Sequence, residues 1–202
     1  MKRPFRRLRM AISTVRLLPQ LGVLLIWHHD GVIKADLLRW AEIWYLEKPK
    51  NLKEFMILFI TFMTFTPEFR NLFYLRFGLK ASIFAWTCPP LDTLEINANY
   101  IGPGLFIQHG ISTLISAHSI GANCWINQQV TIGYSNQTDR PTIGDNVRVC
   151  AGAKIIGKIR IGNNATIGAN TIVISDVAAN TTVFGVPGKV IWRSRPAPVD
   201  AD

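Results

Sequence analysis

Large aliphatic residues recur every six positions in the second half of this chain. A period of six fits neither the 3.6-residue period of a helix nor the two-residue alternation of an ordinary strand, and it indicates a repeat architecture. The set takes one longer step of eleven residues, and its members are Leu114, Ile120, Ile126, Ile132, Ile143, Val149, Ile155, Ile161, Ile167 and Val173. We predict that these residues point inward and that those from 120 to 167 are buried along one axis.

The other positions of each hexad agree with this interpretation. A glycine follows the aliphatic position at 102, 121, 133, 144, 162 and 168, where a chain that turns every six residues needs a permissive backbone. The fifth position is small or β-branched at Cys124, Val130, Val147, Ala153, Ala165, Thr171 and Val177. Three such hexads form one triangular coil of short parallel strands, and stacked coils bury one continuous apolar column. The pattern therefore predicts a mainly β protein, a parallel β-helix of hexapeptide repeats.

Two departures from the period mark the places where we expect chemistry. One extra residue stands between Ile107 and Leu114, directly after His109, and five extra residues lengthen the stretch 133–142 into a loop. Insertions in repeat proteins form surface loops, which often carry the binding face. His118 falls on a fifth position that suits a small residue. Either it lines a site, or the register slips there and it lies in an exposed turn.

The first part of the chain follows helical rules instead. Asn51 followed by Glu54 resembles a capping box ahead of an apolar helix, and the stretch 66–68 places a threonine cap, an N1 proline and an acid in order. Gly78 ends the second of these helices, and the stretch 88–90, Cys-Pro-Pro, ends helical structure altogether. We therefore divide the chain into an α-helical segment over 1–90, the β-helix over 91–191 and a tail over 192–202.

Histidines and aromatic residues of the helical segment are assigned to structure. His28 and His29 are expected to be structural. One apolar stripe at helical spacing is assigned to packing or to a subunit interface rather than to a cofactor, and it consists of Phe69, Leu72, Phe73 and Phe77.

The net charge of +9 is concentrated in the helical segment. Residues 1–90 hold 14 Lys and Arg against 6 Asp and Glu, whereas residues 91–202 hold 8 against 7. Six basic residues precede position 17 with no acid among them: Lys2, Arg3, Arg6, Arg7, Arg9 and Arg16. Such a segment suits an anionic membrane surface or nucleic acid, the alternative being a solvated helix end. We expect peripheral contact with the inner face of a membrane, and no nucleic-acid partner.

Hydropathy and cysteine usage favour a cytoplasmic protein. Apolar runs at 17–27 and 55–66 fall short of the roughly 20 residues that a spanning helix needs, and no small-residue cleavage site follows the first run. Cys88, Cys124 and Cys150 stand 36 and 26 residues apart, which gives neither a zinc spacing nor an even disulfide framework. We therefore expect a reducing compartment and no metal, with Cys150 an inert thiol.

Residues 101–191 resemble the serine acetyltransferase branch of the hexapeptide-repeat acyltransferases. The stretches that carry the resemblance are IGPGLFIQHG (101–110), INQQVTIG (126–133), PTIGDNV (141–147), AGAKIIGKIRIG (151–162), IGANTIV (167–173) and VFGVPGKVI (183–191). The resemblance implies a left-handed coil and a homotrimer or a multiple of it. It also implies acetyl-CoA as co-substrate, bound in the groove between neighbouring β-helices, with direct transfer of the acetyl group.

Within this resemblance His109 matches the family's catalytic histidine. A neutral imidazole can take the proton of an alcohol as it attacks a thioester, so the chemistry agrees. Glu95 sits about where the family keeps a carboxylate that orients the imidazole, the alternative being an exposed acid. The positions that match contacts to CoA are Gly133, Ala151, Gly152, Lys154, Gly168, Ala169, Lys189 and Arg193. For any single glycine of this set, ordinary repeat geometry is an equal explanation.

The acceptor is where the chain departs from the family. The serine enzymes carry an aspartate just before the catalytic histidine and a second histidine in the loop, but here Gln108 precedes His109 and the loop holds Arg140 without a histidine. Neutral Gln108, with Asn127 and Gln128, suits a hydroxyl-rich sugar better than an amino acid, which needs charged partners. We expect O-acetylation of a sugar in polysaccharide biosynthesis, with a small-molecule or lipid-linked acceptor. The resemblance is closest to capsular and exopolysaccharide O-acetyltransferases.

Other functions remain to be weighed against this one. Serine O-acetylation, in cysteine biosynthesis, is the alternative within the enzyme class. A non-catalytic hexapeptide scaffold is disfavoured because the surroundings of His109, the loop and the CoA-type stretches are all retained. A β-helical carbonic anhydrase would need three histidines on zinc, and only His109 and His118 lie in the repeats.

Overall fold

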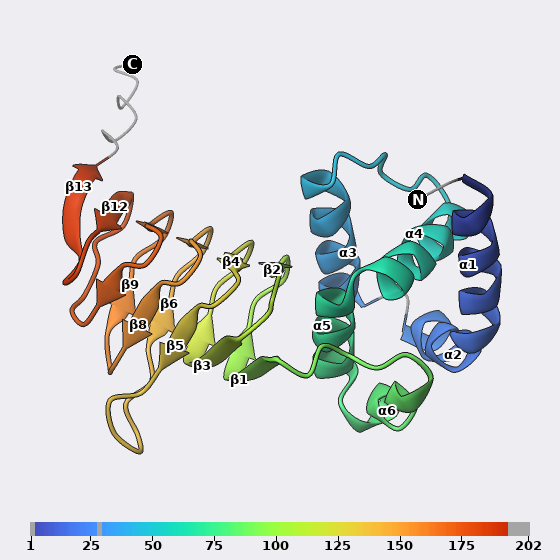
Figure 1. Ribbon diagram of the computed structural model, residues 1–202, viewed down its shortest axis with the longest axis horizontal. Helices are drawn as coiled ribbons and strands as arrows, with labels where there is room; N and C mark the ends of the chain where they lie inside the picture. Colours follow the sequence, from blue (N-terminus) through green and yellow to red (C-terminus); the bar gives the residue numbers. More distant parts are fainter. Residues whose placement is uncertain (1–2, 28–29, 194–202) are drawn as a thin grey trace.

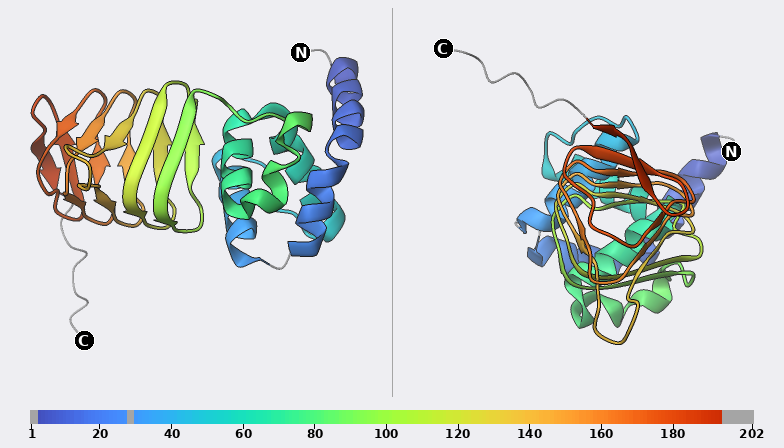
Figure 2. Two further views of the ribbon diagram at one scale, coloured as in Figure 1. Left: turned by 90° about the horizontal axis from the view of Figure 1, so that it is seen from below. Right: turned by 90° about the vertical axis from the view of Figure 1, so that its left-hand side faces the viewer.

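A computed structural model describes residues 3–27 and 30–193. Helices gather at one end of an elongated molecule and a parallel β-helix forms the other (Figure 1). Seen along the rod, the coils of the β-helix stack on one another around a roughly triangular outline (Figure 2). His28 and His29, assigned above to structure, lie outside the described residues.

Within residues 3–27 and 30–87 the helical half contains six α-helices and one 3₁₀ turn. They are α1 (Arg3–Arg16), α2 (Leu18–Trp27), α3 (Gly31–Ile43), α4 (Leu52–Phe65), α5 (Pro67–Phe77), α6 (Leu79–Ser82) and η1 (Ala85–Thr87). Among the described residues, no single helix is both long and apolar enough to cross a membrane. The pair Leu8–Arg16 and Leu18–Ile26 passes that test together, but it is bent by 65°.

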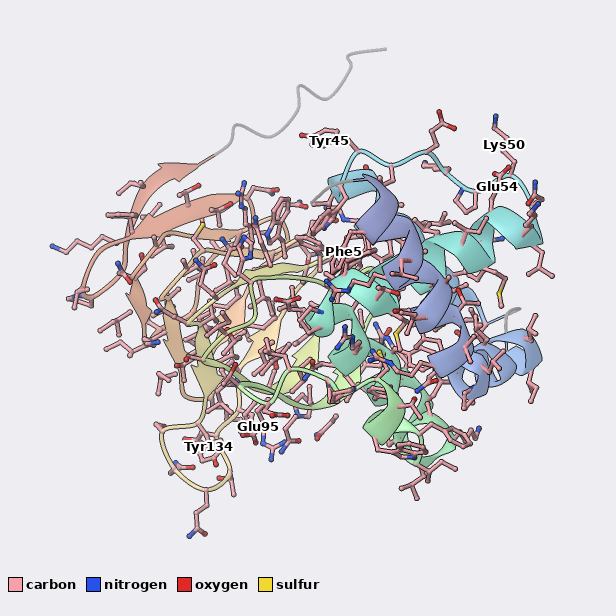
Figure 3. All side chains as sticks on the ribbon, turned by 45° about the vertical axis from the view of Figure 1, so that its right-hand side comes forward. Phe5, Tyr45, Lys50, Glu54, Glu95 and Tyr134 are labelled. Carbon is pink, nitrogen blue, oxygen red and sulfur yellow. The ribbon has the colours of Figure 1, made fainter. Side chains whose placement is uncertain are left out.

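The expected helix boundaries are confirmed by their caps. The Asn51 side chain accepts a hydrogen bond from the Glu54 N–H at 2.9 Å, and Glu54 in return accepts from the backbone of Lys50 at 2.8 Å (Figure 3). Helix α5 begins at Pro67 and ends at Gly78, whose φ of 55° only glycine adopts without strain. The last helical turn ends at Thr87, ahead of the two prolines.

The helical core is built from aromatic rings. The predicted packing of the α5 stripe is confirmed, because all four of its members are buried. Trp40 of α3 meets Phe62 and Phe69 edge to face, at centroid distances of 5.9 and 5.3 Å. It also meets Phe106, on the second strand of the β-helix, at 4.6 Å. The aromatic core therefore extends across the junction of the two halves.

Thirteen strands follow between residues 94 and 193, the last residue that the structure describes. They are β1 (Leu94–Ile101), β2 (Phe106–Gln108), β3 (Thr113–Ile120), β4 (Trp125–Asn127), β5 (Thr131–Gly133), β6 (Thr142–Ile143), β7 (Arg148–Val149), β8 (Lys154–Ile156), β9 (Arg160–Ile161), β10 (Thr166–Ile167), β11 (Ile172–Val173), β12 (Thr181–Phe184) and β13 (Lys189–Arg193). One sheet runs β11-β8-β5-β3-β6-β9, with β1 beside β3, and the other runs β13-β12-β10-β7-β4-β2. All pairings are parallel except that of β12 with β13, a closing hairpin that the repeat did not predict.

The hexapeptide repeat is confirmed over most of its length. The eight positions predicted to share one buried axis, from Ile120 to Ile167, are at most 2% exposed, and Val173 is 3% exposed. The prediction is wrong at Leu114, which is 36% exposed, because Ile115 takes the inward place beside Ile132. The same shift puts Ala117 in the small buried slot and leaves His118 exposed. The register therefore slips in the strand that follows His109.

The corners of the coils are formed by residues in the left-handed region of φ. One column of corners consists of Gly104, Asn123, Asn146, Asn164 and Asn180, with φ between 54° and 81°. Asparagine tolerates this conformation better than most residues with a Cβ, which explains its recurrence here. At Gly144, in the adjoining stretch, a Cβ would lie 2.3 Å from the Asn163 side chain, so the tight stacking of coils requires a glycine.

A buried ion pair joins the two halves. Arg76 of α5 binds Asp36 of α3, which is fully buried, with Nε 2.8 Å from Oδ2. The same guanidinium donates to the carbonyls of Ile101 and Gly102 in the first coil, and Asp36 accepts from the Gly104 N–H at 2.6 Å. Burial raises the pKa of Asp36, although Arg76 and the backbone donor oppose the rise. Together these bonds fix the first coil against the helices.

Candidate active site

His109 stands at a corner of the β-helix where strand β2 ends. Its φ is 54°, its side chain is exposed, and its carbonyl accepts from the Ile111 N–H at 2.6 Å in a tight turn. Gly110 is pressed against the helical half, since a Cβ there would lie 2.9 Å from Leu94 and 3.1 Å from Glu68. The Gly110 part of the turn is thus packed against neighbouring side chains, whereas the His109 imidazole remains accessible.

Glu68 is the carboxylate that the fold brings to this turn. It lies in the first turn of α5, is buried, and accepts from the Gly110 N–H at 3.2 Å through Oε1. Glu68 also lines the same cavity as His109. From the sequence, Glu68 was recognisable only as an acid near a helix start. Nothing in the sequence relates residue 68 to residue 110, because the contact depends on how α5 packs on the first coil.

A cavity of about 620 Å³ opens beside His109, between the helices and the β-helix. Its polar groups are few, and they include Gln108, His109 and Glu68. The rest of its wall is largely aromatic, supplied from both halves by Trp40, Trp44, Tyr45, Phe65, Phe106 and Trp125. A concave, mostly apolar site with a few converging polar groups is the common form of a small-molecule site.

A hydrogen bond fixes the orientation of Gln108. The indole N–H of Trp125 donates to Gln108 Oε1 at 3.2 Å, and Arg148 lies over the Trp125 ring at 4.7 Å. Gln108 is a neutral group that can offer a ligand its NH₂ donors and the remaining lone pair of its oxygen. Asn127 pairs with Gln108 in the strand register, one coil further along. These two predicted acceptor residues are therefore neighbours, with Gln128 immediately after them.

Glu95 lies away from this cavity. It occupies the second position of β1, beside Leu114, and is exposed. In the described part of the chain no hydrogen bond joins it to His109. Tyr45, which lines the cavity, and Glu95 project on opposite sides of the molecule (Figure 3). The structure therefore does not bring together the two residues that the sequence analysis assigned to catalysis.

Small residues continue the His109 corner along the rod. In the register of β2, β4, β7 and β10, the positions after each strand align His109 with Gln128, Ala151 and Ala169. The coils stack about 4.8 Å apart, so three steps span about 14 Å. Along this column the Gly152 N–H donates to the Gln128 carbonyl and the Asn170 N–H to that of Ala151. The corner thus offers a long, narrow surface without large side chains.

The glycines predicted to contact CoA divide into two kinds. Gly152 has a φ of 73°, and a Cβ at Gly168 would lie 2.2 Å from the Phe184 ring, so repeat geometry and packing explain both. At Gly133 a Cβ would meet nothing closer than 3.9 Å, and the φ there does not call for glycine. The fold of one chain therefore does not require a glycine at 133, and a ligand or a neighbouring chain would be a reason for it.

The predicted cationic residues are dispersed. The Lys154 ammonium donates to the Gln129 carbonyl at 2.6 Å, on the His109 corner. Lys189 is exposed in the last hairpin, and the side chain of Arg193 is outside the described atoms. Arg140 lies elsewhere: it lines a separate cleft of about 710 Å³ with His118, Lys158 and Arg160, under the projecting loop.

Cysteine and metal chemistry find no support in the described residues. Burial raises the pKa of the Cys124 thiol to about 11, and Cys88 is buried as well. Cys150 is half-buried and unpaired. Over residues 3–27 and 30–193, no group of three or more His, Cys, Asp or Glu side chains could hold a metal ion.

Known proteins share both the repeat and the architecture. A family model described as bacterial transferase hexapeptide (six repeats) matches residues 140–175. The inward column, the corners and this match agree on a hexapeptide-repeat fold of the transferase type, a parallel β-helix preceded by helices.

The individual matches narrow the comparison to one kind of transferase. The chain is 45% identical over 98 residues to a serine acetyltransferase of Synechococcus elongatus, a stretch covering 46% of this chain and 40% of the relative. The crystal structure of the Neisseria gonorrhoeae serine acetyltransferase superposes with a TM-score of 0.64 at 28% identity, covering 85% of this chain and 69% of that one. A second structure of that enzyme, in complex with serine, gives 0.60 at 30%, covering 79% and 68%.

These matches are to serine acetyltransferases rather than to polysaccharide O-acetyltransferases, the branch to which the sequence seemed closest. In sequence, the matched stretch spans less than half the length of the curated relatives.

Proposed function

We propose that this protein transfers the acetyl group of acetyl-CoA to an acceptor hydroxyl, with His109 as the general base. The observation that carries the proposal is an accessible imidazole at the rim of a cavity, on a corner that continues as a column of small residues. The imidazole takes the hydroxyl proton as the oxygen attacks the thioester carbonyl. The carbon–sulfur bond then breaks, and the proton passes to the departing CoA thiolate.

Acetyl-CoA fits the His109 corner by shape. Ala151 and Ala169 leave room along the column, and Gly133 is a glycine that the single chain does not require. Backbone groups and Lys154 would hold the arm there. Since the column is exposed on one chain, a homotrimer in which a neighbour covers it completes the proposal. Light scattering of the purified protein tests this assembly: a trimer or a multiple of it is expected, and a monomer contradicts it.

Glu68, rather than Glu95, is the carboxylate that we assign to the site. Its bond to Gly110 positions the turn that carries His109, and it faces the same cavity. Glu68→Gln should lower kcat and shift its pH profile, whereas Glu95→Gln should leave both unchanged. The reverse result would restore Glu95 to the role that the resemblance gives it.

For the acceptor we propose a neutral, hydroxyl-rich molecule of the sugar class. Gln108, whose oxygen accepts from Trp125 and whose NH₂ group donates, gives a hydroxyl a neutral partner beside His109. Aromatic walls suit the apolar faces of a sugar ring. A polysaccharide precursor, free or lipid-linked, is the expected acceptor.

L-serine is the second candidate, and the comparisons favour it. Serine acetyltransferases match 95–98 residues of the chain at 43–45% identity, and one similar structure is a serine acetyltransferase in complex with serine. Under this alternative Glu68 would meet the ammonium of serine inside the cavity, and a cation for its carboxylate would come from outside the cavity of one chain, such as Arg140 of a neighbouring subunit.

The decisive experiment measures acetyl-CoA turnover against L-serine and a panel of nucleotide- and lipid-linked sugars. His109→Ala should lose roughly 10²–10⁴-fold in turnover while acetyl-CoA affinity, measured by calorimetry, hardly changes. His118→Ala is the matched control, an exposed histidine outside the cavity, and should retain activity. If His109→Ala and His118→Ala behave alike, the proposed base is wrong.

Gln108 and Trp125 separate the two acceptors. Trp125→Phe keeps the ring but frees the Gln108 oxygen, so activity toward a sugar should fall and any activity toward L-serine should rise. Gln108→Asp should act in the same direction. Wild-type turnover of L-serine on the order of 1–10³ s⁻¹ would mean that the acceptor is L-serine and not a sugar.

A further inference from the structure

Helix α1 presents an apolar stripe to the outside of the molecule. Phe5, Leu8 and Ile12 are each 59% exposed and Val15 is 69% exposed. Their spacing of three, four and three residues aligns them on one helix face. The helix packs through the opposite side, where Ser13 is buried and Met10 is half-buried. A stripe of large side chains facing away from the core is unexplained by the fold of one chain.

The charge of α1 and its position in the molecule also indicate what the stripe contacts. Helix α1 carries five arginines and no acidic residue within its 14 residues. It lies at the outer edge of the helical half, on the side away from the β-helix (Figures 1 and 2). The apolar surface continues onto α2, where Leu18 is 60% and Ile26 74% exposed, after a bend of 65° between the two helices.

We infer that α1 lies on the surface of an anionic membrane, with its apolar stripe among the acyl chains and the net positive charge of the helix near the headgroups. A helix with one exposed apolar face, an excess of arginine and no acid has the composition of an interfacial helix. The bend between α1 and α2 suits a helix that rests in the interface rather than one that crosses it.

A second copy of the chain is a poorer occupant of the stripe. Pairing two α1 helices would bring five arginines of one copy close to five of the other. A helix of 14 residues is about 21 Å long and about 10 Å wide, so the stripe offers on the order of 200 Å² per copy. Stable interfaces bury about 800 Å² on each partner. An anionic lipid surface complements both the positive charge and the apolar face of α1.

Flotation of the full-length protein with lipid vesicles tests this inference. One set of vesicles is phosphatidylcholine alone, and the other is an equal mixture of phosphatidylcholine and phosphatidylglycerol. The protein should float with the anionic vesicles and much less with the neutral ones, and raised salt should weaken binding because it screens the charges. Equal recovery on both vesicle types would overturn the inference. So would binding that survives alkaline washing, because it would indicate insertion of the bent α1–α2 pair.

Variants assign the binding to the stripe. The double substitution Leu8→Asn and Ile12→Asn should weaken vesicle binding about tenfold or more, since it removes two of the four exposed apolar groups. Leu79→Asn with Ile83→Asn is the matched control, because both residues are exposed in the same half but off α1; it should bind like the wild type. Unchanged binding by the α1 variant contradicts the proposal. A smaller oligomer for that variant in light scattering would also contradict it, by showing that the stripe joins copies of the chain.

Discussion

The helical half and the β-helix bury apolar surface in different ways. The helices interlock aromatic rings that come from distant positions, as Trp40 does with Phe69 and Phe106. The β-helix stacks one kind of residue on the next coil, as Ile126 does with Val149. In a stack of repeats each coil contacts only its neighbours, and stability is close to a sum of nearest-neighbour terms. The helical half has no such additivity, because each ring belongs to several contacts at once.

The candidate active site lies where these two kinds of packing meet. His109 and Gln108 come from the first coil, whereas Glu68 and Trp44 come from helices. The repeat is irregular at this point, since the inward position moves to Ile115. An irregular coil packed against an aromatic core can therefore form a cavity that a regular repeat does not form.

The largest expected effect comes from breaking the junction. Arg76→Met leaves Asp36 buried without its partner, which should cost about 3–5 kcal/mol of unfolding free energy. Urea unfolding followed by circular dichroism measures the loss. The control is Arg39→Met, which removes an exposed pair with Glu42 and should cost under about 1 kcal/mol. Similar losses for the two variants would mean that the ion pair does not hold the halves together.

The next largest effect tests which residue points inward in the irregular coil. Ile115→Ala should cost about 2–5 kcal/mol because the side chain is fully buried, whereas Leu114→Ala should cost under about 1 kcal/mol. The two substitutions are adjacent in sequence, so denaturant midpoints compare them directly. A larger loss at Leu114 would restore the uninterrupted six-residue register and contradict the slip.

A smaller effect tests the backbone strain at the corners of the β-helix. Asn146 has a φ of 54°, so Asn146→Ala should cost about 1–2 kcal/mol through backbone strain. Asn146→Gly accepts the same φ and should be nearly neutral at that corner. Thermal unfolding of the pair gives the difference. Equal melting temperatures would mean that the corner is not strained for alanine.

The smallest expected effect is on how the unfolding free energy depends on pH, and it has one contributing group in each half. Burial raises the pKa of Tyr74 in the helical half to about 12, and that of Cys124 in the β-helix to about 11. Because both values lie above the ordinary 10.0 and 9.0, the folded state holds these protons more tightly, and stability falls as pH rises through these ranges. Cys124→Ala should flatten the decline in unfolding free energy between pH 9.0 and about 11, and Tyr74→Phe should flatten it between pH 10.0 and about 12. A decline unchanged in both variants would assign it to other groups.

The sequence by itself determined the repeat, the helix ends and the class of protein. Aliphatic spacing, small fifth positions and caps such as Asn51 are local signals, since each residue contacts its chain neighbours or the equivalent residue of the next coil. His109 was also identifiable, because an extra residue interrupts the period beside it.

Tertiary structure alone decided the inward residue at Ile115, the partnership of Glu68 with Gly110, and the fixed orientation of Gln108. The physical reason is that these contacts join α5 to the first coil and one coil to the next. They depend on how elements dock, a property that no spacing along the chain records. Glu95 was chosen because the resemblance places an orienting carboxylate near that position, and its exposed place on β1 follows from which strand β1 pairs with.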